Sequence, residues 1–201
     1  RPFIKSSGFN KCISEDDFKL KESKNRWGVY DRILFDKMFS DIRRAESPFF
    51  KVAFTLSSHE PFDLPYKSQF NGKDASDKFR NSINYTDSCL GRFIIEAKKE
   101  PWWENTLVVF IADHGHRLPE KLIYSEKKSF RIPMLWIGGA LMYKDTIVNN
   151  IGSQTDLSAT LLNQLNLNSD SFIFSKDLLA GSQEYAMYNF ADGFGFITPD
   201  A

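Results

Sequence analysis

Residues 106–116 read Thr-Leu-Val-Val-Phe-Ile-Ala-Asp-His-Gly-His, and this stretch decides the fold class. Its first seven residues are almost continuously apolar, which is typical of a strand that is covered on both faces in a parallel sheet. The polar side chains of Asp113 and His114 follow directly at the carboxyl end of that strand. Ligands of α/β sheets bind at this end. The stretch therefore predicts a buried strand that carries Asp113 and His114 into a functional site.

Helical patterns occur on both sides of this strand. Apolar residues recur at three- and four-residue steps in two segments, which predicts helices over about 29–45 and 79–97. Ser47-Pro48 ends the first pattern and Pro101 closes the second. A third helix is expected over 156–165, with Thr155 or Asp156 as its cap.

Strand patterns alternate with these helices. Short runs rich in aromatic and apolar residues predict further strands at Phe50–Leu56, 132–137 and 185–190. Strands that alternate with helices predict an α/β fold, layered α/β/α with a mainly parallel sheet. The sequence contains no internal repeat and no linker rich in Pro, Gly or Ser. We therefore expect residues 1–201 to form one compact unit.

The composition excludes several classes of protein. Apolar residues make up 42% of the chain, enough to bury a core, and 26 basic residues balance 26 acidic ones, so no cationic surplus favours nucleic acid. The longest apolar stretch, Ile132–Met142, is too short to cross a bilayer.

Residues 1–5 contain neither an initiating Met nor a leader pattern, so we expect a fragment of a longer protein. Cys12 and Cys89 lack metal-ligand spacing; free thiols are the favoured reading over a disulfide.

All three histidines of the chain lie just beyond predicted strands: His59 after one, His114 and His116 after the other. Asp113 and His114 offer a carboxylate oxygen and an imidazole nitrogen, a combination that suits Zn²⁺ or Mn²⁺. Gly115 lets the backbone bend close to such an ion. Two ligands do not hold a catalytic metal, so further ligands must come from elsewhere. His116 is a ligand of a second ion, a substrate contact or a solvated loop residue, and the pattern does not choose among these.

Six segments in a fixed order carry a resemblance to a known family. The segment ADHGHR resembles the second metal-binding motif of the alkaline phosphatase superfamily. The whole series resembles the sulfatase-like branch, which includes lipoteichoic acid synthases and phosphoglycerol transferases: LSSHEPF (56–62), YTDSCLGRFI (85–94), ADHGHR (112–117), FRIPMLWIGG (130–139), QTDLSATLL (154–162) and NFADGFGFI (189–197). The resemblance implies an alkaline-phosphatase-like fold and makes residues 1–201 the C-terminal part of an extracytoplasmic catalytic domain.

The resemblance also implies roles for individual residues. Asp113 and His114 match ligands of a catalytic divalent ion, Mn²⁺ or Mg²⁺, with Zn²⁺ in related enzymes. His59 matches a histidine that contacts the substrate phosphate, where it either donates to a nonbridging oxygen or protonates the leaving group. We expect His116 to contact the substrate. Trp27 also recurs in relatives, and we expect it to pack before the first helix.

The activity implied is metal-dependent transfer of phosphoglycerol from an anionic phospholipid to a glycan or polyol acceptor, outside a bacterial membrane. Its nucleophile and its membrane helices would lie upstream of this chain. Two alternatives stay open: a sulfatase, or a module that is not catalytic in isolation. The chain contains no C/S-x-P-x-R signature of true sulfatases.

Overall fold

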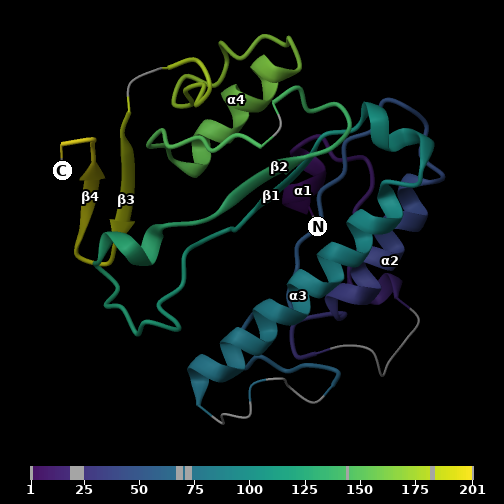
Figure 1. Ribbon diagram of the computed structural model, residues 1–201, viewed down its shortest axis with the longest axis horizontal. Helices are drawn as coiled ribbons and strands as arrows, with labels where there is room; N and C mark the ends of the chain where they lie inside the picture. Colours follow the sequence, from purple (N-terminus) through teal and green to yellow (C-terminus); the bar gives the residue numbers. More distant parts are fainter. Residues whose placement is uncertain are drawn as a thin grey trace. The chain divides into compact units, whose positions relative to one another are not determined.

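The computed structural model describes residues 2–18, 25–66, 70, 74–143, 145–181 and 184–200. These residues form two compact units, shown as a ribbon in Figure 1: Arg1–Thr106 with Leu118–Lys121, and Leu107–Arg117 with Leu122–Ala201. The single unit expected from the sequence is therefore wrong. The sequence shows no linker at this division, because the boundary falls at Leu107, inside the apolar run. The division is also not a single cut, since Leu118–Lys121 belongs to the first unit.

The first unit is helical. It contains α1 (Pro2–Ser6), α2 (Asp31–Ile42) and α3 (Ala75–Ala97), with short 3₁₀ helices at Glu15–Asp17 and Pro101–Asn105. The two long helices predicted from the sequence are confirmed. Helix α3 begins earlier than its apolar pattern because the side chain of Asp74 accepts a hydrogen bond from the backbone N–H of Asp77 and caps it. Phe35 of α2 and Phe93 of α3 are buried, with ring centroids 5.5 Å apart, and they form the core between the helices.

Residues 50–56 do not form the strand that their composition predicted. Phe50, Val52 and Phe54 alternate along the segment and are 71%, 52% and 64% exposed. A segment becomes a strand only when a neighbouring backbone pairs with it. Within the described ranges this one has no such ladder, and the backbone N–H of Leu56 donates instead to the carboxylate of Asp31.

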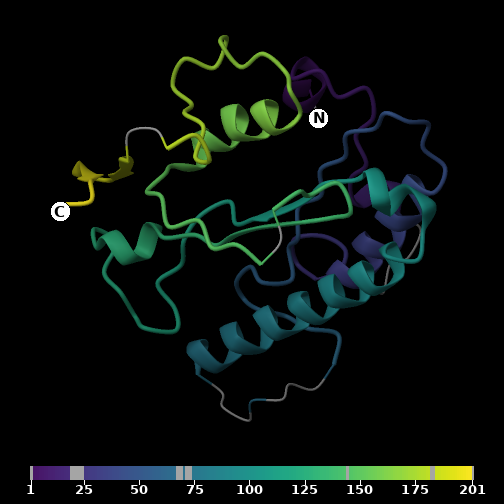
Figure 2. The ribbon, with the colours of Figure 1, turned by 45° about the horizontal axis from the view of Figure 1, so that its top comes forward.

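The described residues of the second unit form two ladders and one α-helix. Strand β1 (Val108–Ile111) pairs with β2 (Met134–Ile137), and β3 (Ala186–Phe190) pairs with β4 (Gly193–Ile197). Figures 1 and 2 show β1 and β2 side by side in both views. Helix α4 (Leu157–Gln164) follows a 3₁₀ turn at Gln154–Asp156, and another 3₁₀ turn spans Lys127–Phe130. The strands and helix predicted in this half are confirmed, and Asp156 is the cap residue of α4.

The fold class is α/β, as predicted, but both ladders within the described residues are antiparallel. The apolar run had predicted a parallel partner for β1. The connection from β1 to β2 holds a single 3₁₀ turn and no crossover helix, so the chain can return in the opposite direction. All four residues of β1 are half-buried, so the strand is not sealed on both faces by this chain.

Strand β4 had no counterpart in the sequence-based prediction. Glycine weakens strand propensity, and Gly193 and Gly195 obscure the pattern. A Cβ at Gly195 would lie 2.1 Å from Cζ of Tyr188 on the paired strand, so any larger residue there would force the tyrosine ring to move. The ring of Tyr188 takes the place that a side chain at Gly195 would fill.

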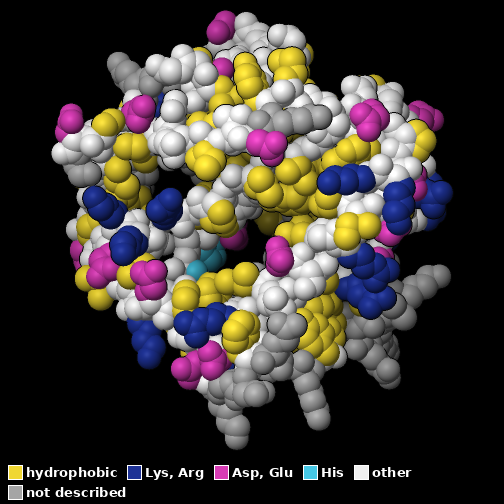
Figure 3. Space-filling view, viewed as in Figure 1, with side chains coloured by type: hydrophobic (Ala, Val, Ile, Leu, Met, Phe, Trp, Pro, Cys, Tyr) yellow, Lys and Arg dark blue, Asp and Glu magenta, His cyan; other side chains and the backbone are white. Residues whose placement is uncertain are grey.

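Charged side chains of both signs are interspersed on the face of the molecule seen in Figure 3. This matches the equal numbers of basic and acidic residues in the sequence. Among the helices of the described ranges, none combines the length and apolarity that crossing a bilayer requires. Cys12 and Cys89 are both free thiols, and Cys89 is buried.

Candidate functional site

Asp113 and His114 lie directly after β1, where their side chains are 73% and 68% exposed. The Nε2 atom of His114 is 3.8 Å from Oδ1 of Asp113, so the two side chains lie next to each other. The Nδ1 atom of His114 lies 2.8 Å from the carbonyl oxygen of Gly115. A carbonyl only accepts, so this hydrogen bond requires a proton on Nδ1 and leaves the Nε2 lone pair to face a ligand. That tautomer is the one in which a histidine can bind a metal through Nε2.

Gly115 and Gln154 determine the path of the loop that carries Asp113 and His114. A Cβ on Gly115 would lie 2.0 Å from the carbonyl oxygen of Ser129, so only glycine allows the backbone to pass there. Gln154 donates from Nε2 to the carbonyl oxygens of Ala112 and Asp113, at 2.8 and 3.1 Å. The sequence analysis missed Gln154. The one available signal was its position at the start of the motif QTDLSATLL, which by itself indicates only a helix start.

His59 belongs to the first unit, in the turn that follows residues 50–56. Its Nδ1 atom lies 3.0 Å from the carbonyl oxygen of Glu60, which requires the same tautomer as in His114. The indole of Trp27 covers its ring, with the centroids 4.1 Å apart, and donates from Nε1 to the same Glu60 carbonyl at 2.5 Å. Trp27 was expected merely to pack before the first helix. It packs on His59 instead and joins the candidate site.

The predicted site residues are divided between the two units. His59 lies in the first, and Asp113, His114 and His116 lie in the second. Within the described part of the chain, no group of three or more His, Cys, Asp or Glu residues could hold a metal ion. The donor set of Asp113 and His114 fits Mn²⁺ or Zn²⁺ better than Mg²⁺, which favours oxygen ligands throughout. His116 is half-buried two residues beyond His114.

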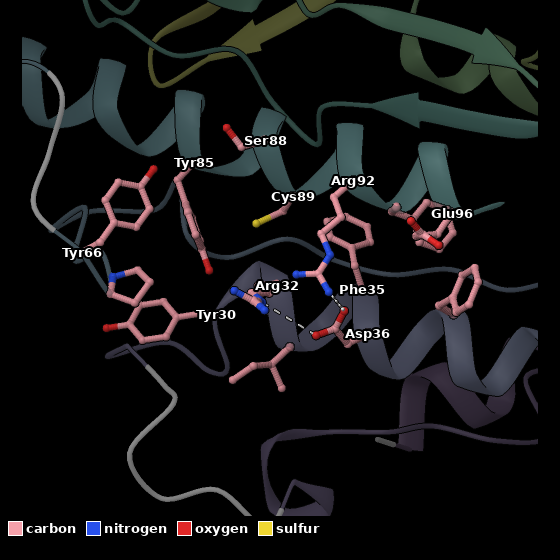
Figure 4. Close-up of a pocket in the computed structure, with 14 residues that line it drawn as sticks. Tyr30, Arg32, Phe35, Asp36, Tyr66, Tyr85, Ser88, Cys89, Arg92 and Glu96 are labelled. Carbon is pink, nitrogen blue, oxygen red and sulfur yellow. Dashed lines mark ion pairs between the residues drawn. The ribbon is translucent and has the colours of Figure 1, made fainter. Parts of the chain in front are cut away.

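A separate cavity of about 710 Å³ lies between α2 and α3 (Figure 4). One end is lined by tyrosines, Tyr66 and Tyr85 among them. The carboxylate of Asp36 lies 3.9 Å from Arg32 and 3.8 Å from Arg92, and dashed lines mark both ion pairs in the figure. None of the site residues predicted from the sequence lines this cavity. Opposite charges offset each other across it, so it offers no particular attraction to a phosphate.

Comparison with known proteins gives a consistent result. The sulfatase family model matches residues 2–167. The chain is 25% identical to "Lipoteichoic acid synthase-like YvgJ" of Bacillus subtilis over 197 residues, covering 88% of this chain and 32% of that protein. It is 28% identical to "Phosphoglycerol transferase I" of Xanthomonas campestris pv. campestris over 189 residues, covering 89% of this chain and 27% of the relative.

Two solved structures have the same fold. An alkaline phosphatase superfamily protein from Vibrio parahaemolyticus superposes with a TM-score of 0.80 at 27% identity, over 95% of this chain and 48% of the other. The lipoteichoic acid synthase LtaP from Listeria monocytogenes gives a TM-score of 0.77 at 24% identity, over 91% and 50%. The chain thus spans between about a quarter and a third of the length of the curated relatives and about half of the solved chains.

Proposed function

Because this chain belongs to the sulfatase family, we propose that it forms part of a metal-dependent enzyme that transfers phosphoglycerol, or a related phospho head group. The donor would be an anionic phospholipid and the acceptor a glycan or polyol. The observation that carries the proposal is the pair Asp113 and His114 beyond β1, with Nδ1 of His114 directed to the Gly115 carbonyl and Nε2 lying 3.8 Å from the carboxylate of Asp113. Relatives named phosphoglycerol transferase and lipoteichoic acid synthase support the reaction class.

Asp113 and His114 would hold the divalent ion, Mn²⁺, Mg²⁺ or Zn²⁺, and further ligands would come from outside this chain. When bound, the ion neutralises charge on the phosphate and favours the ionised form of an attacking hydroxyl. Gln154 keeps the two ligands in place through its hydrogen bonds to Ala112 and Asp113. The nucleophile would lie N-terminal to this chain.

His59 would contact the phosphate. Its Nδ1–H is directed to the Glu60 carbonyl, so a neutral imidazole can only accept at Nε2. Donation to a phosphate oxygen therefore requires the protonated ring. In that form Nε2–H donates first to the phosphate and then passes its proton to the departing alkoxide oxygen of the lipid, which leaves a neutral imidazole. His116 would contact the substrate beside the metal, and the reaction would take place on the extracytoplasmic face of a bacterial membrane.

The test uses the intact protein that contains this chain. Asp113→Asn and His114→Ala should abolish release of diacylglycerol from phosphatidylglycerol vesicles and should lower bound metal, measured by mass spectrometry. Asp192→Asn removes the same charge from another exposed position in the second unit and should change neither.

Two outcomes would overturn the proposal. One is wild-type turnover in Asp113→Asn at saturating Mn²⁺ or Zn²⁺. The other is hydrolysis of an aryl sulfate by the wild-type protein with no release of diacylglycerol, which would make it a sulfatase.

A further inference from the structure

Asp31 is a fully buried carboxylate at the first residue of α2, with 0% of its surface exposed. Its Oδ1 atom accepts hydrogen bonds from the backbone N–H groups of Leu56 and Ser57, at 3.0 and 3.1 Å. Its Oδ2 atom accepts from the hydroxyl of Thr86 on α3, at 2.6 Å. In return, the backbone N–H of Asp31 donates to Oγ of Ser57 at 3.0 Å. Helix α2, the turn at residues 56–57 and helix α3 are joined at this one side chain.

These three donors to the carboxylate are all uncharged. Burial of a carboxylate among neutral groups costs solvation free energy that its hydrogen bonds must offset. An apolar residue would pack the same space without that cost. The benefit of a carboxylate at position 31 must therefore lie in the groups that it holds.

The groups held by Asp31 lead directly to His59. The carbonyl of Leu56 accepts from the backbone N–H of His59 at 3.2 Å, and the carbonyl of His59 accepts from the N–H of Phe62 at 2.9 Å. Fixing the N–H groups of Leu56 and Ser57 thus fixes the start of the turn on which the imidazole stands.

The second support of His59 is attached to the same carboxylate through the chain. Trp27, which covers the imidazole, lies four residues before Asp31. Asn25 ties this segment to the turn: its Nδ2 donates to the Leu56 carbonyl at 3.3 Å, and its Oδ1 accepts from the Trp27 N–H at 2.8 Å. Displacement of the Asp31 contacts would separate the indole from the imidazole as well as loosen the turn.

We infer that Asp31 is a positioning residue for His59, acting through the backbone of Leu56 and Ser57, and that Thr86 holds the carboxylate in the orientation this requires. The inference deepens the proposed function, because it rests on that function for the contact between His59 and phosphate. Removal of the carboxylate should allow the ring to shift by about 1 Å, a displacement that can lower turnover by about 10²-fold.

The experiment reads the position of His59 directly by NMR. A His59→Gln variant assigns the Hε1 resonance of His59, because that signal is absent from its spectrum. The indole of Trp27 shifts that resonance by its ring current, and Trp27→Leu gives the position without it. In the intact protein, Asp31→Ala should move the His59 resonance toward the Trp27→Leu position and leave those of His114 and His116 unchanged.

Three further variants separate positioning from general destabilisation. Thr86→Val should shift the His59 resonance in the same direction, whereas Thr86→Ser retains the hydroxyl and should restore it. Asn81→Ala is the matched control, because Asn81 is a buried polar residue of α3 that hydrogen bonds to the backbone of Phe70, at 3.0 and 3.1 Å. It should leave His59 in place. Thr86→Val serves alone if Asp31→Ala does not fold.

Turnover measured on the same variants completes the test. A displaced resonance with kcat lowered about 10²-fold supports the inference. An unchanged His59 resonance in Asp31→Ala and Thr86→Val, or an equal shift in Asn81→Ala, would overturn it. A displaced resonance with unchanged turnover would leave the positioning role intact and would refute the role of His59 in the proposed function.

Discussion

Replacement of Gln154 by glutamate should weaken metal binding without unfolding the protein. Gln154 donates from Nε2 to the carbonyl oxygens of Ala112 and Asp113, at 2.8 and 3.1 Å. Glutamate has nearly the same shape but no donor, and its carboxylate would face two carbonyl oxygens that repel it. The loop that carries Asp113 and His114 would lose its fixed geometry. The side chain is exposed, so the change should have little effect on the core.

The magnitude follows from the two hydrogen bonds. Neutral hydrogen bonds contribute about 1 kcal/mol each, so about 2 kcal/mol of positioning free energy is at stake. If all of it is lost from the bound state, the metal dissociation constant rises about 30-fold. This lies within the range of 10- to 100-fold that is usual for residues that orient metal ligands.

The assay is isothermal titration of the intact protein with Mn²⁺, with thermal unfolding measured alongside. Gln164→Glu makes the same change of charge at the end of α4 and serves as the control. Gln154→Glu should raise the dissociation constant and leave the midpoint of thermal unfolding within a few degrees of wild type. An unchanged dissociation constant in Gln154→Glu, or an equal rise in Gln164→Glu, would refute the positioning role.

Two predictions concern stability. The ammonium of Lys176 forms an ion pair with the buried carboxylate of Asp156, which also accepts hydrogen bonds from the backbone N–H groups of Ser153 and Lys176. Asp156→Ala would leave that ammonium without its partner. The free energy of unfolding, measured by urea denaturation, should therefore fall by about 3–5 kcal/mol. A loss below about 1 kcal/mol would contradict this. Burial and the nearby Cys89 raise the pKa of Tyr85 above its ordinary value of 10.0. Its contribution to stability should be complete below about pH 10 and lost as the pH rises toward that raised pKa. Tyr85→Phe should flatten this dependence of the unfolding free energy on pH. A wild-type protein whose stability does not fall above about pH 10 would contradict the prediction.

The helices were predictable because their signals are local. Apolar residues at three- and four-residue steps placed Ile42 and Phe93 on single helical faces, and both residues are buried in the structure; the buried Phe35 was not part of the predicted face. The position of Asp113 and His114 just beyond β1 was predictable for a similar reason, since the apolar run that marks the strand ends in these two polar residues. The strand at Phe50–Leu56 was predicted wrongly, because a strand also depends on a partner that local composition does not specify.

The residues that support the site were not predictable in the same way. Gln154 is distant in sequence from the carbonyls of Ala112 and Asp113 to which it donates, and Asp31 from the Leu56 backbone. From the sequence alone, polar residues such as these indicate only a helix start or a solvated loop. Their partners are backbone groups, which carry no sequence signature. Trp27 was noticed, yet its contact with His59 depends on the path of the chain through the turn.

The sequence by itself determined the α/β class, the positions of α2, α3 and α4, the family, and the functional groups that Asp113, His114 and His59 carry. These properties depend on side-chain type and on short-range periodicity, both of which are written in the order of the residues. Only the tertiary structure decided that β1 pairs antiparallel with β2, that the chain divides into two units, and that the side chains of Asp31 and Gln154 hydrogen bond to the backbone near His59 and at Asp113. Such features arise from hydrogen bonds between distant backbone groups, which are common to every residue and become specific only when the chain has folded.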